Sequence, residues 1–119
     1  MSDIKTLDSE INQMILSGQA MEAFEKHYAE DIVMVENFDA PCEGKEANRK
    51  REIAFFSNIE AWHGGSVGAT AIGDNVSFSE WFMDVSFKGG NRVQMRQVAV
   101  RTWKDGKVVH ERFYYKPAN

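Results

Sequence analysis

The chain has 119 residues, of which 43% are hydrophobic and 12% aromatic, enough to build one ordinary hydrophobic core and too many for a disordered protein. Its formal net charge at pH 7 is -4, and its longest basic run is Arg49-Lys50-Arg51. This excludes the strongly basic surface of a typical nucleic-acid-binding protein. We expect a single domain over residues 1–119, without a nucleic-acid partner.

Membrane, secretion and disulfide signals are also missing from the sequence. No stretch approaches the ~20 apolar residues of a membrane span, and the segment from Met1 to Asp8 is polar and acidic. Cys42 is the only cysteine, so an internal disulfide and a zinc cluster built on cysteines are excluded. The sequence predicts a cytoplasmic protein that has no membrane partner.

The first half of the chain is predicted to be mainly helical. Apolar residues recur at helical spacing from Ile4 to Leu16, and Gly18 ends the pattern. A short second helix is predicted from Ala20 to Tyr28, followed by β-branched, extended sequence at Ile32–Val35. A third helix is predicted from Lys45 to Ile59, with its basic residues on an exposed face.

After Trp62 the pattern changes to strands that are separated by short turns. We predict four of them, at Ser66–Ile72, Val76–Phe87, Val93–Trp103 and Val108–Tyr115. Helices followed by an antiparallel meander indicate an α+β fold, in which the helices pack on one face of the sheet.

Two registers are open for the last hairpin. A two-residue Asp-Gly turn pairs Lys104 with Lys107, whereas a three-residue loop with Gly106 in the left-handed conformation pairs Trp103 with Lys107. We favour the three-residue loop because it gathers mostly apolar residues on an inner face, namely Trp81, Met83, Val85, Phe87, Val93, Met95, Gln97, Ala99, Arg101, Trp103, Val109, Glu111, Phe113 and Tyr115.

The outer face is then a mixture of charged, aromatic and aliphatic residues: Glu80, Phe82, Asp84, Arg92, Arg96, Val98, Val100, His110, Arg112 and Tyr114. It fits a protein interface and a solvated surface with cross-strand ion pairs equally well. The apolar alternation slips between Val76 and Trp81, which predicts a β-bulge near Ser79 or Glu80. A bulge would bend the sheet, and helices across the bend would enclose a cavity.

Several segments together resemble a known family. They are Tyr28-Ala29-Glu30-Asp31 at the entry to a strand, Pro41 and Gly44 before a helix, and the hairpin from Trp103 to Val109. Over nearly its whole length the chain resembles the SnoaL-like branch of the nuclear transport factor 2-like superfamily. The resemblance implies a cystatin-like cone: a curved antiparallel (mixed) sheet, three N-terminal helices, a hydrophobic pocket, and a homodimer through the outer sheet face.

Relatives in this superfamily include ketosteroid isomerases, polyketide cyclases, dehydratases and proteins without catalysis, so the fold does not name a reaction. The isomerases place a carboxylate base late in the first strand, and Glu36 matches that place. Their two oxyanion donors would fall at Ile11 or Asn12 and at Ala99, which cannot supply them. Steroid isomerisation is therefore not expected.

Two carboxylates are the catalytic candidates. Glu36 should point to the cavity, where an apolar setting would raise its pKa toward that of a useful base; the alternative is a solvated strand end. Glu111 lies among apolar residues of the inner face, so it either takes part in chemistry or forms an ion pair with Arg101.

The candidate substrate-binding residues are Tyr28, His63, Trp81, Met83, Met95, Gln97, Phe113 and Tyr115. The aromatic and thioether groups among them suit a hydrophobic or aromatic small molecule, although they could equally fill an ordinary core. His63 could titrate near neutral pH or lie on the surface. The three histidines lack metal-ligand spacing, and no phosphate-binding or dinucleotide motif occurs, so no metal or cofactor is predicted.

Two functions are consistent with these features. The first is a small-molecule-binding protein that acts as a cofactor-independent isomerase, cyclase or lyase through carboxylate proton transfer. The second is a noncatalytic homodimeric module that binds a ligand or a partner protein.

Overall fold

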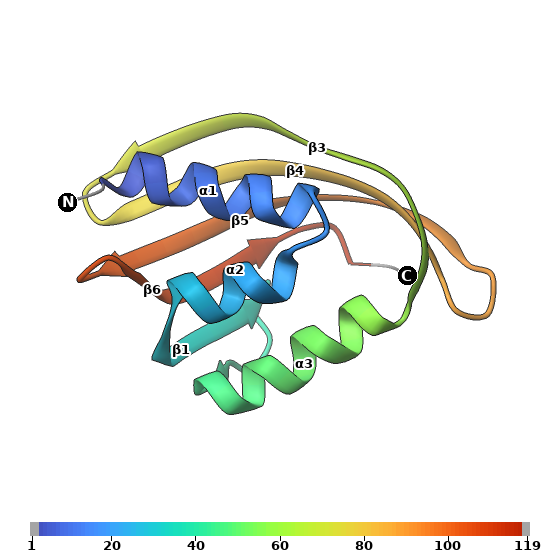
Figure 1. Ribbon diagram of the computed structural model, residues 1–119, viewed down its shortest axis with the longest axis horizontal. Coiled ribbons are helices and arrows are strands. Elements are labelled where there is room, and N and C mark those ends of the chain that lie inside the picture. The colour runs from blue at the N-terminus through green and yellow to red at the C-terminus, as the bar shows by residue number, and fades with distance from the viewer. Residues whose placement is uncertain (1–2, 118–119) are drawn as a thin grey trace.

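The computed structural model describes residues 3–117, which form three helices and one six-stranded sheet. The strands lie in the order β2-β1-β6-β5-β4-β3; β1 and β6 are parallel, and the other neighbours are antiparallel. Figure 1 shows that β3 and β4 bend strongly and that the helices lie inside the bend. The expected α+β cone with a mixed sheet is confirmed.

The helices begin and end close to the predicted residues. α1 (Ile4–Leu16) begins after Asp3, whose carboxylate accepts a hydrogen bond from the Thr6 backbone N–H at 2.9 Å. α2 (Ala20–His27) ends before Tyr28, because the backbone of that residue is already extended. α3 (Lys45–Ser57) ends two residues before the predicted Ile59, with Asn58 as its C-cap.

β1, β3 and β5 are longer than the sequence predicted, and β6 is shifted by one residue toward the N-terminus. β1 is Tyr28–Glu36, β3 is Ile59–Gly73, β5 is Arg92–Lys104 and β6 is Lys107–Tyr114, while β4 (Val76–Phe87) has its predicted bounds. A short strand that was not predicted, β2 (Cys42–Glu43), pairs with β1. The prediction that β3 begins at Ser66 was wrong, because the strand continues through Gly64 and Gly65, which pair with Asp84 and Met83.

The preferred register of the last hairpin was also wrong. Lys104 pairs with Lys107, so Asp105 and Gly106 form a two-residue turn, and both have positive φ angles, 52° and 77°. The inner face nevertheless remains in place, because Val109 is an extra residue in β6 without a partner opposite it. Val108, instead of the predicted Val109, is the residue buried in the core.

The predicted bulge in β4 does not occur. β4 pairs with β5 in one continuous register from Val76 to Ser86, and the irregularity lies in β3 instead, between Val67 and Thr70. Phe78 therefore stays on the outer face, 40% exposed, while Ser77 is buried on the inner face. The apolar alternation of β4 slips because the strand buries two polar residues, Ser77 and Ser79, on its inner face.

Candidate functional site

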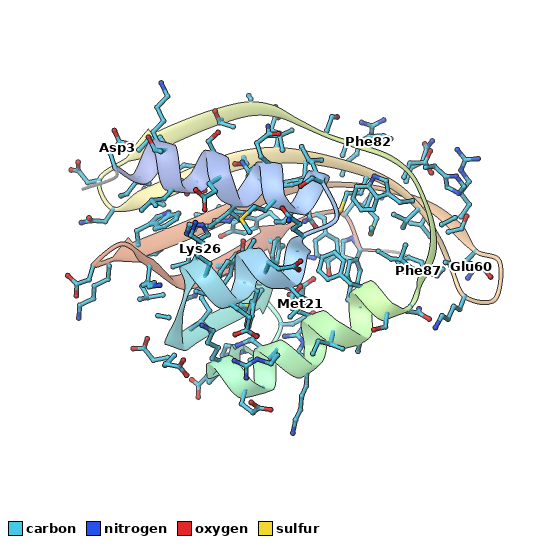
Figure 2. All side chains as sticks on the ribbon, in the orientation of Figure 1. Asp3, Met21, Lys26, Glu60, Phe82 and Phe87 are labelled. Atoms are coloured by element: carbon cyan, nitrogen blue, oxygen red, sulfur yellow. The ribbon has the colours of Figure 1, made fainter. Side chains whose placement is uncertain are left out.

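A cavity of about 670 Å³ lies between the inner face of the sheet and the three helices. Most of the side chains that line it are apolar; they include Ile11, Ile15, Phe24, Met34, Phe55, Phe56, Trp81 and Met83. Phe55 on α3 lines the cavity, and its ring packs against that of Phe87 at the end of β4 (labelled in Figure 2), with centroids 5.8 Å apart. The interior is thus not filled completely by its own side chains.

Every predicted site residue except His63 lines this cavity: Tyr28, Glu36, Trp81, Met83, Met95, Gln97, Glu111, Phe113 and Tyr115. They come from β1, β4, β5, β6 and the residue that follows β6. His63 lies outside the cavity, exposed on β3, where its Nε2 is 2.7 Å from the Ser86 hydroxyl oxygen. This placement does not support a role for His63 in binding a molecule within the cavity.

Glu111 lines the cavity and is held by two hydrogen-bond donors. Its Oε1 accepts a hydrogen bond from the Tyr28 hydroxyl at 2.7 Å, and its Oε2 accepts one from Arg101 Nε at 2.8 Å. All three side chains are buried. Burial and the negative charge of Glu111 raise the pKa of Tyr28 well above its usual range, so the hydroxyl keeps its proton and remains a donor.

Arg101 connects Glu111 to a second buried carboxylate on α1. Its Nη1 donates to Asp8 Oδ1 and to Asn12 Oδ1, each at 2.8 Å. Asp8 also accepts a hydrogen bond from the Ser77 hydroxyl at 2.8 Å. These contacts explain the polar residues of β4 that face inward, because each serine completes the hydrogen bonding of a buried charge.

Glu36 is the less constrained of the two predicted carboxylates. It lies half-buried at the end of β1, and its Oε1 accepts a hydrogen bond from the Tyr115 hydroxyl at 3.1 Å. Burial raises the pKa of Glu36, while the Tyr115 hydrogen bond and the positive charge of Arg51 oppose that rise. Glu36 thus combines partial desolvation with a free carboxylate oxygen, as a general base requires.

A third carboxylate, Glu52 on α3, lines the same cavity and was missed by the sequence analysis. Burial, followed by the charges of Glu111 and Glu36, raises its pKa to about 8. No hydrogen bond or ion pair within residues 3–117 involves Glu52. It therefore differs from Glu111, whose two oxygens both accept hydrogen bonds.

Glu52 was missed because α3 does not follow the usual amphipathic pattern. Its apolar Ile53 is 47% exposed, whereas Lys45 and Asn48 are buried. The Lys45 ammonium donates to the Tyr28 backbone oxygen at 2.8 Å, and Asn48 Nδ2 donates to the Cys42 backbone oxygen at 2.9 Å. Hydrophobic periodicity cannot locate the inward face of a helix that packs through polar groups.

Residues 3–117 contain neither a cluster of metal ligands nor a helix suited to cross a membrane. No three His, Cys, Asp or Glu side chains there come together in an arrangement that could hold a metal ion. None of the helices described in that range is long and apolar enough to cross a membrane.

Residues 4–115 match the family model described as a SnoaL-like domain. No curated protein matches the chain significantly. Among solved structures, a Mesorhizobium loti protein named as a candidate SnoaL-like polyketide cyclase is 32% identical, with a TM-score of 0.85, and the alignment covers 96% of this chain and 100% of the other. The predicted resemblance is thus confirmed.

Two more distant structures share the fold. A candidate SnoaL-like polyketide cyclase from Jannaschia sp. CCS1 is 15% identical, with a TM-score of 0.77 and coverage of 96% of this chain and 88% of that one. AclR, a candidate hydroxylase from Streptomyces galilaeus, is 17% identical, with a TM-score of 0.78 and coverage of 94% and 87%. At these identities the likeness concerns the fold alone.

Proposed function

The chain belongs to the SnoaL-like domain family, and on that premise we propose that it binds a small, largely apolar molecule in the cavity and moves a proton on it with Glu36. The observation that carries the proposal is the open cavity. Its volume, about 670 Å³, falls within the roughly 300–1,000 Å³ range of small-molecule sites. Aromatic rings and methionines line most of it and would cover a flat apolar ligand.

The ligand-binding surface would come mainly from β4, β5 and β6. Trp81, Met83, Met95 and Phe113 present rings and thioethers to the cavity. The rigid rings would cover an apolar ligand at a low cost in conformational entropy, and the flexible thioethers would adapt to its shape. The Gln97 amide is polar and only partly buried, so it would orient a polar group of the ligand. These five side chains would bind a ligand in the same way whether or not a reaction follows.

Glu36 is a better base than Glu111 for a physical reason. Both oxygens of Glu111 accept charge-assisted or buried hydrogen bonds, and taking up a proton would break one of them at a cost of about 1–3 kcal/mol. Glu36 accepts one hydrogen bond, from Tyr115, and keeps its other oxygen free. We assign proton transfer to Glu36 and a positioning role to Glu111.

The reaction class is proton abstraction from a carbon next to a carbonyl group. Glu36 takes the proton, the electron pair of the C–H bond moves into the carbonyl system, and reprotonation gives an isomerised or cyclised product. The cyclase name of the Mesorhizobium loti relative supports this class. Steroid isomerisation is not proposed, because Ile11 and Ala99 carry no donor and Asn12 is occupied by Ser79 and Arg101.

The proposal can be tested with 2-tetralone, a flat ketone that has acidic protons next to its carbonyl. Proton NMR in D₂O measures how fast those protons exchange. We expect the protein to accelerate exchange and Glu36→Gln to reduce the acceleration by about 100-fold or more. Glu60→Gln is the matched control, since Glu60 is an exposed glutamate on β3 outside the cavity (Figure 2).

Each outcome decides between the two functions. Exchange that depends on Glu36 supports the catalytic proposal. Binding of 2-tetralone without faster exchange contradicts it and favours a noncatalytic ligand-binding module. If 2-tetralone does not bind at all, the proposed ligand class is wrong.

We also propose that the chain forms a homodimer through the outer sheet face. The exposed rings of Phe78 and Tyr114 support this, as does Phe38, which is 84% exposed and whose ring centroid lies 5.9 Å from that of Tyr114.

Light scattering coupled to gel filtration measures the mass of the protein in solution. Phe78→Lys should shift a dimer toward monomer, whereas Ile53→Lys on α3 should not; a monomeric wild-type protein would contradict the proposal.

A further inference from the structure

Glu52 is a carboxyl group without a partner at the wall of the cavity. It lines the cavity together with Phe55 and Phe56, which follow it by one turn on α3. Among the described residues, no donor forms a hydrogen bond with Glu52 and no cation lies close enough to form an ion pair with it. Glu52 is partly buried, and a carboxylate that loses hydration without gaining a partner tends to keep its proton.

The groups that face Glu52 favour the protonated form. Across the cavity, β1 contributes Glu36 and β6 contributes Glu111, and both negative charges disfavour a third. Tyr28 on β1 is also near, but its hydroxyl is used by Glu111. Within residues 3–117, the opposing charge that acts on Glu52 is that of Arg51, whose side chain is exposed to water.

We propose that Glu52 carries a proton in the ligand-free protein and donates it in a hydrogen bond to a carbonyl oxygen of the bound molecule. This inference rests on the proposed function and adds the substrate class: neutral, apolar molecules with a carbonyl group. The raised pKa of Glu52, about 8, is in agreement with it. Glu36 would then be the base and Glu52 the acid of one site, two carboxyl groups whose environments separate their roles.

The proton balance of the step closes with these two residues. The Glu36 carboxylate takes the proton from the carbon next to the carbonyl, and the C–H electron pair forms the new carbon–carbon double bond. The carbonyl electron pair moves to oxygen, which receives the proton of Glu52. The site then holds a protonated Glu36, an ionised Glu52 and a neutral enol, and return of the two protons restores the enzyme.

Charged ligands fit this site less well than neutral ones. A carboxylate ligand would place its charge beside Glu36, Glu52 and Glu111, where like charges repel. An ammonium ligand would instead draw Glu52 into its ionised form as a counter-ion. The two cases separate experimentally, because only a neutral carbonyl ligand requires Glu52 to keep its proton at neutral pH.

The test compares 2-tetralone with tetralin, the hydrocarbon of the same shape without the oxygen, in three proteins. Glu52→Gln keeps a hydrogen-bond donor of the same size, whereas Glu52→Leu removes it and suits a helix. We expect Glu52→Leu to weaken 2-tetralone binding about tenfold and Glu52→Gln to change it by less than about threefold. Tetralin should bind Glu52→Leu as tightly as the wild type, or more tightly.

A second readout follows the proton directly. The infrared spectrum at neutral pH should contain the carbonyl stretch of a protonated carboxyl group, and this band should be lost in Glu52→Leu. A band at pH 7 together with selective loss of ketone binding supports the inference. Absence of the band, or equal weakening of both ligands in Glu52→Leu, overturns it.

The two proposals fail in different ways. If the wild type binds neither bicyclic molecule, the proposed function fails as well, whereas binding of both molecules with no effect of Glu52→Leu overturns the inference alone. Tighter binding of 2-aminotetralin, an ammonium ion at neutral pH, than of 2-tetralone, with release of the Glu52 proton to the solvent, would overturn it in favour of an amine ligand.

Discussion

Arg101 and Glu111 lie directly opposite each other on β5 and β6, and Arg101 Nε donates to Glu111 Oε2 at 2.8 Å inside the core. The same guanidinium binds Asp8 of α1, so one buried cation joins the sheet to the first helix. Both residues of this pair line the cavity, together with the two less constrained carboxyl groups, Glu36 and Glu52.

Replacement of Arg101 by methionine should destabilise the fold strongly. Asp8 and Glu111 would remain buried without their cation, which costs about 3–5 kcal/mol of unfolding free energy. Urea denaturation measures the loss. Arg92→Met is the matched control, because Arg92 pairs with Asp84 on the outer face with its own side chain 58% exposed, and its loss should cost about 1 kcal/mol or less. Equal losses in the two variants would contradict the assignment.

The stability of the protein should depend on pH through Glu52. Its pKa in the fold, about 8, lies above its ordinary value of 4.5, so the folded state binds the proton more tightly than the unfolded state. The stability that the proton provides is therefore present below about pH 4.5 and is lost as the pH rises toward 8.

The difference between wild type and Glu52→Gln isolates this effect. Relative to the variant, the wild type should lose up to about 1.4 kcal/mol for each pH unit within that window, as measured by urea denaturation at several pH values. A constant difference from pH 5 to pH 8 would mean that Glu52 titrates as an ordinary carboxyl group.

Arg51 should tune the acidity of the site without supporting the fold. Its positive charge lowers the pKa of Glu36 and of Glu52, although burial still raises both. Arg51→Met should therefore shift both titrations to higher pH in carbon-13 NMR of labelled glutamate. Lys50→Met removes a charge from the next residue, which is exposed and does not line the cavity, and should leave both titrations in place.

The turn of the last hairpin should require glycine at position 106. Gly106 has a φ of 77°, where a Cβ atom is strained, so Gly106→Ala should cost about 1–2 kcal/mol. Gly64→Ala is the control: Gly64 has no positive φ, and no atom lies within 4 Å of an added Cβ. Thermal unfolding measures both. An unchanged Gly106→Ala would argue for a different turn.

Part of the candidate site could be predicted from the sequence because it follows the alternation of strands. Trp81, Met83 and Val85 are buried on one face as their spacing predicted, and Glu36 continues the inward series of β1. Glu52 could not be predicted in this way, because it lies on a helix that buries lysine and asparagine. The face that α3 turns toward the cavity depends on the backbone oxygens that Lys45 and Asn48 reach in other elements.

The sequence by itself determined most of the elements and the apolar faces of α1 and β4, because helix and strand periodicity is a property of neighbouring residues: α1 and β4 have the predicted bounds. Only the tertiary structure decided where the extra residue of β6 lies, why Ser77 faces inward, and which carboxyl groups share the cavity. Each of these depends on partners far apart in the chain, such as Asp8 and Arg101, whose contact forms only when α1 packs on the sheet. Local sequence patterns carry no information about such long-range pairs, although these pairs set the electrostatics of the site.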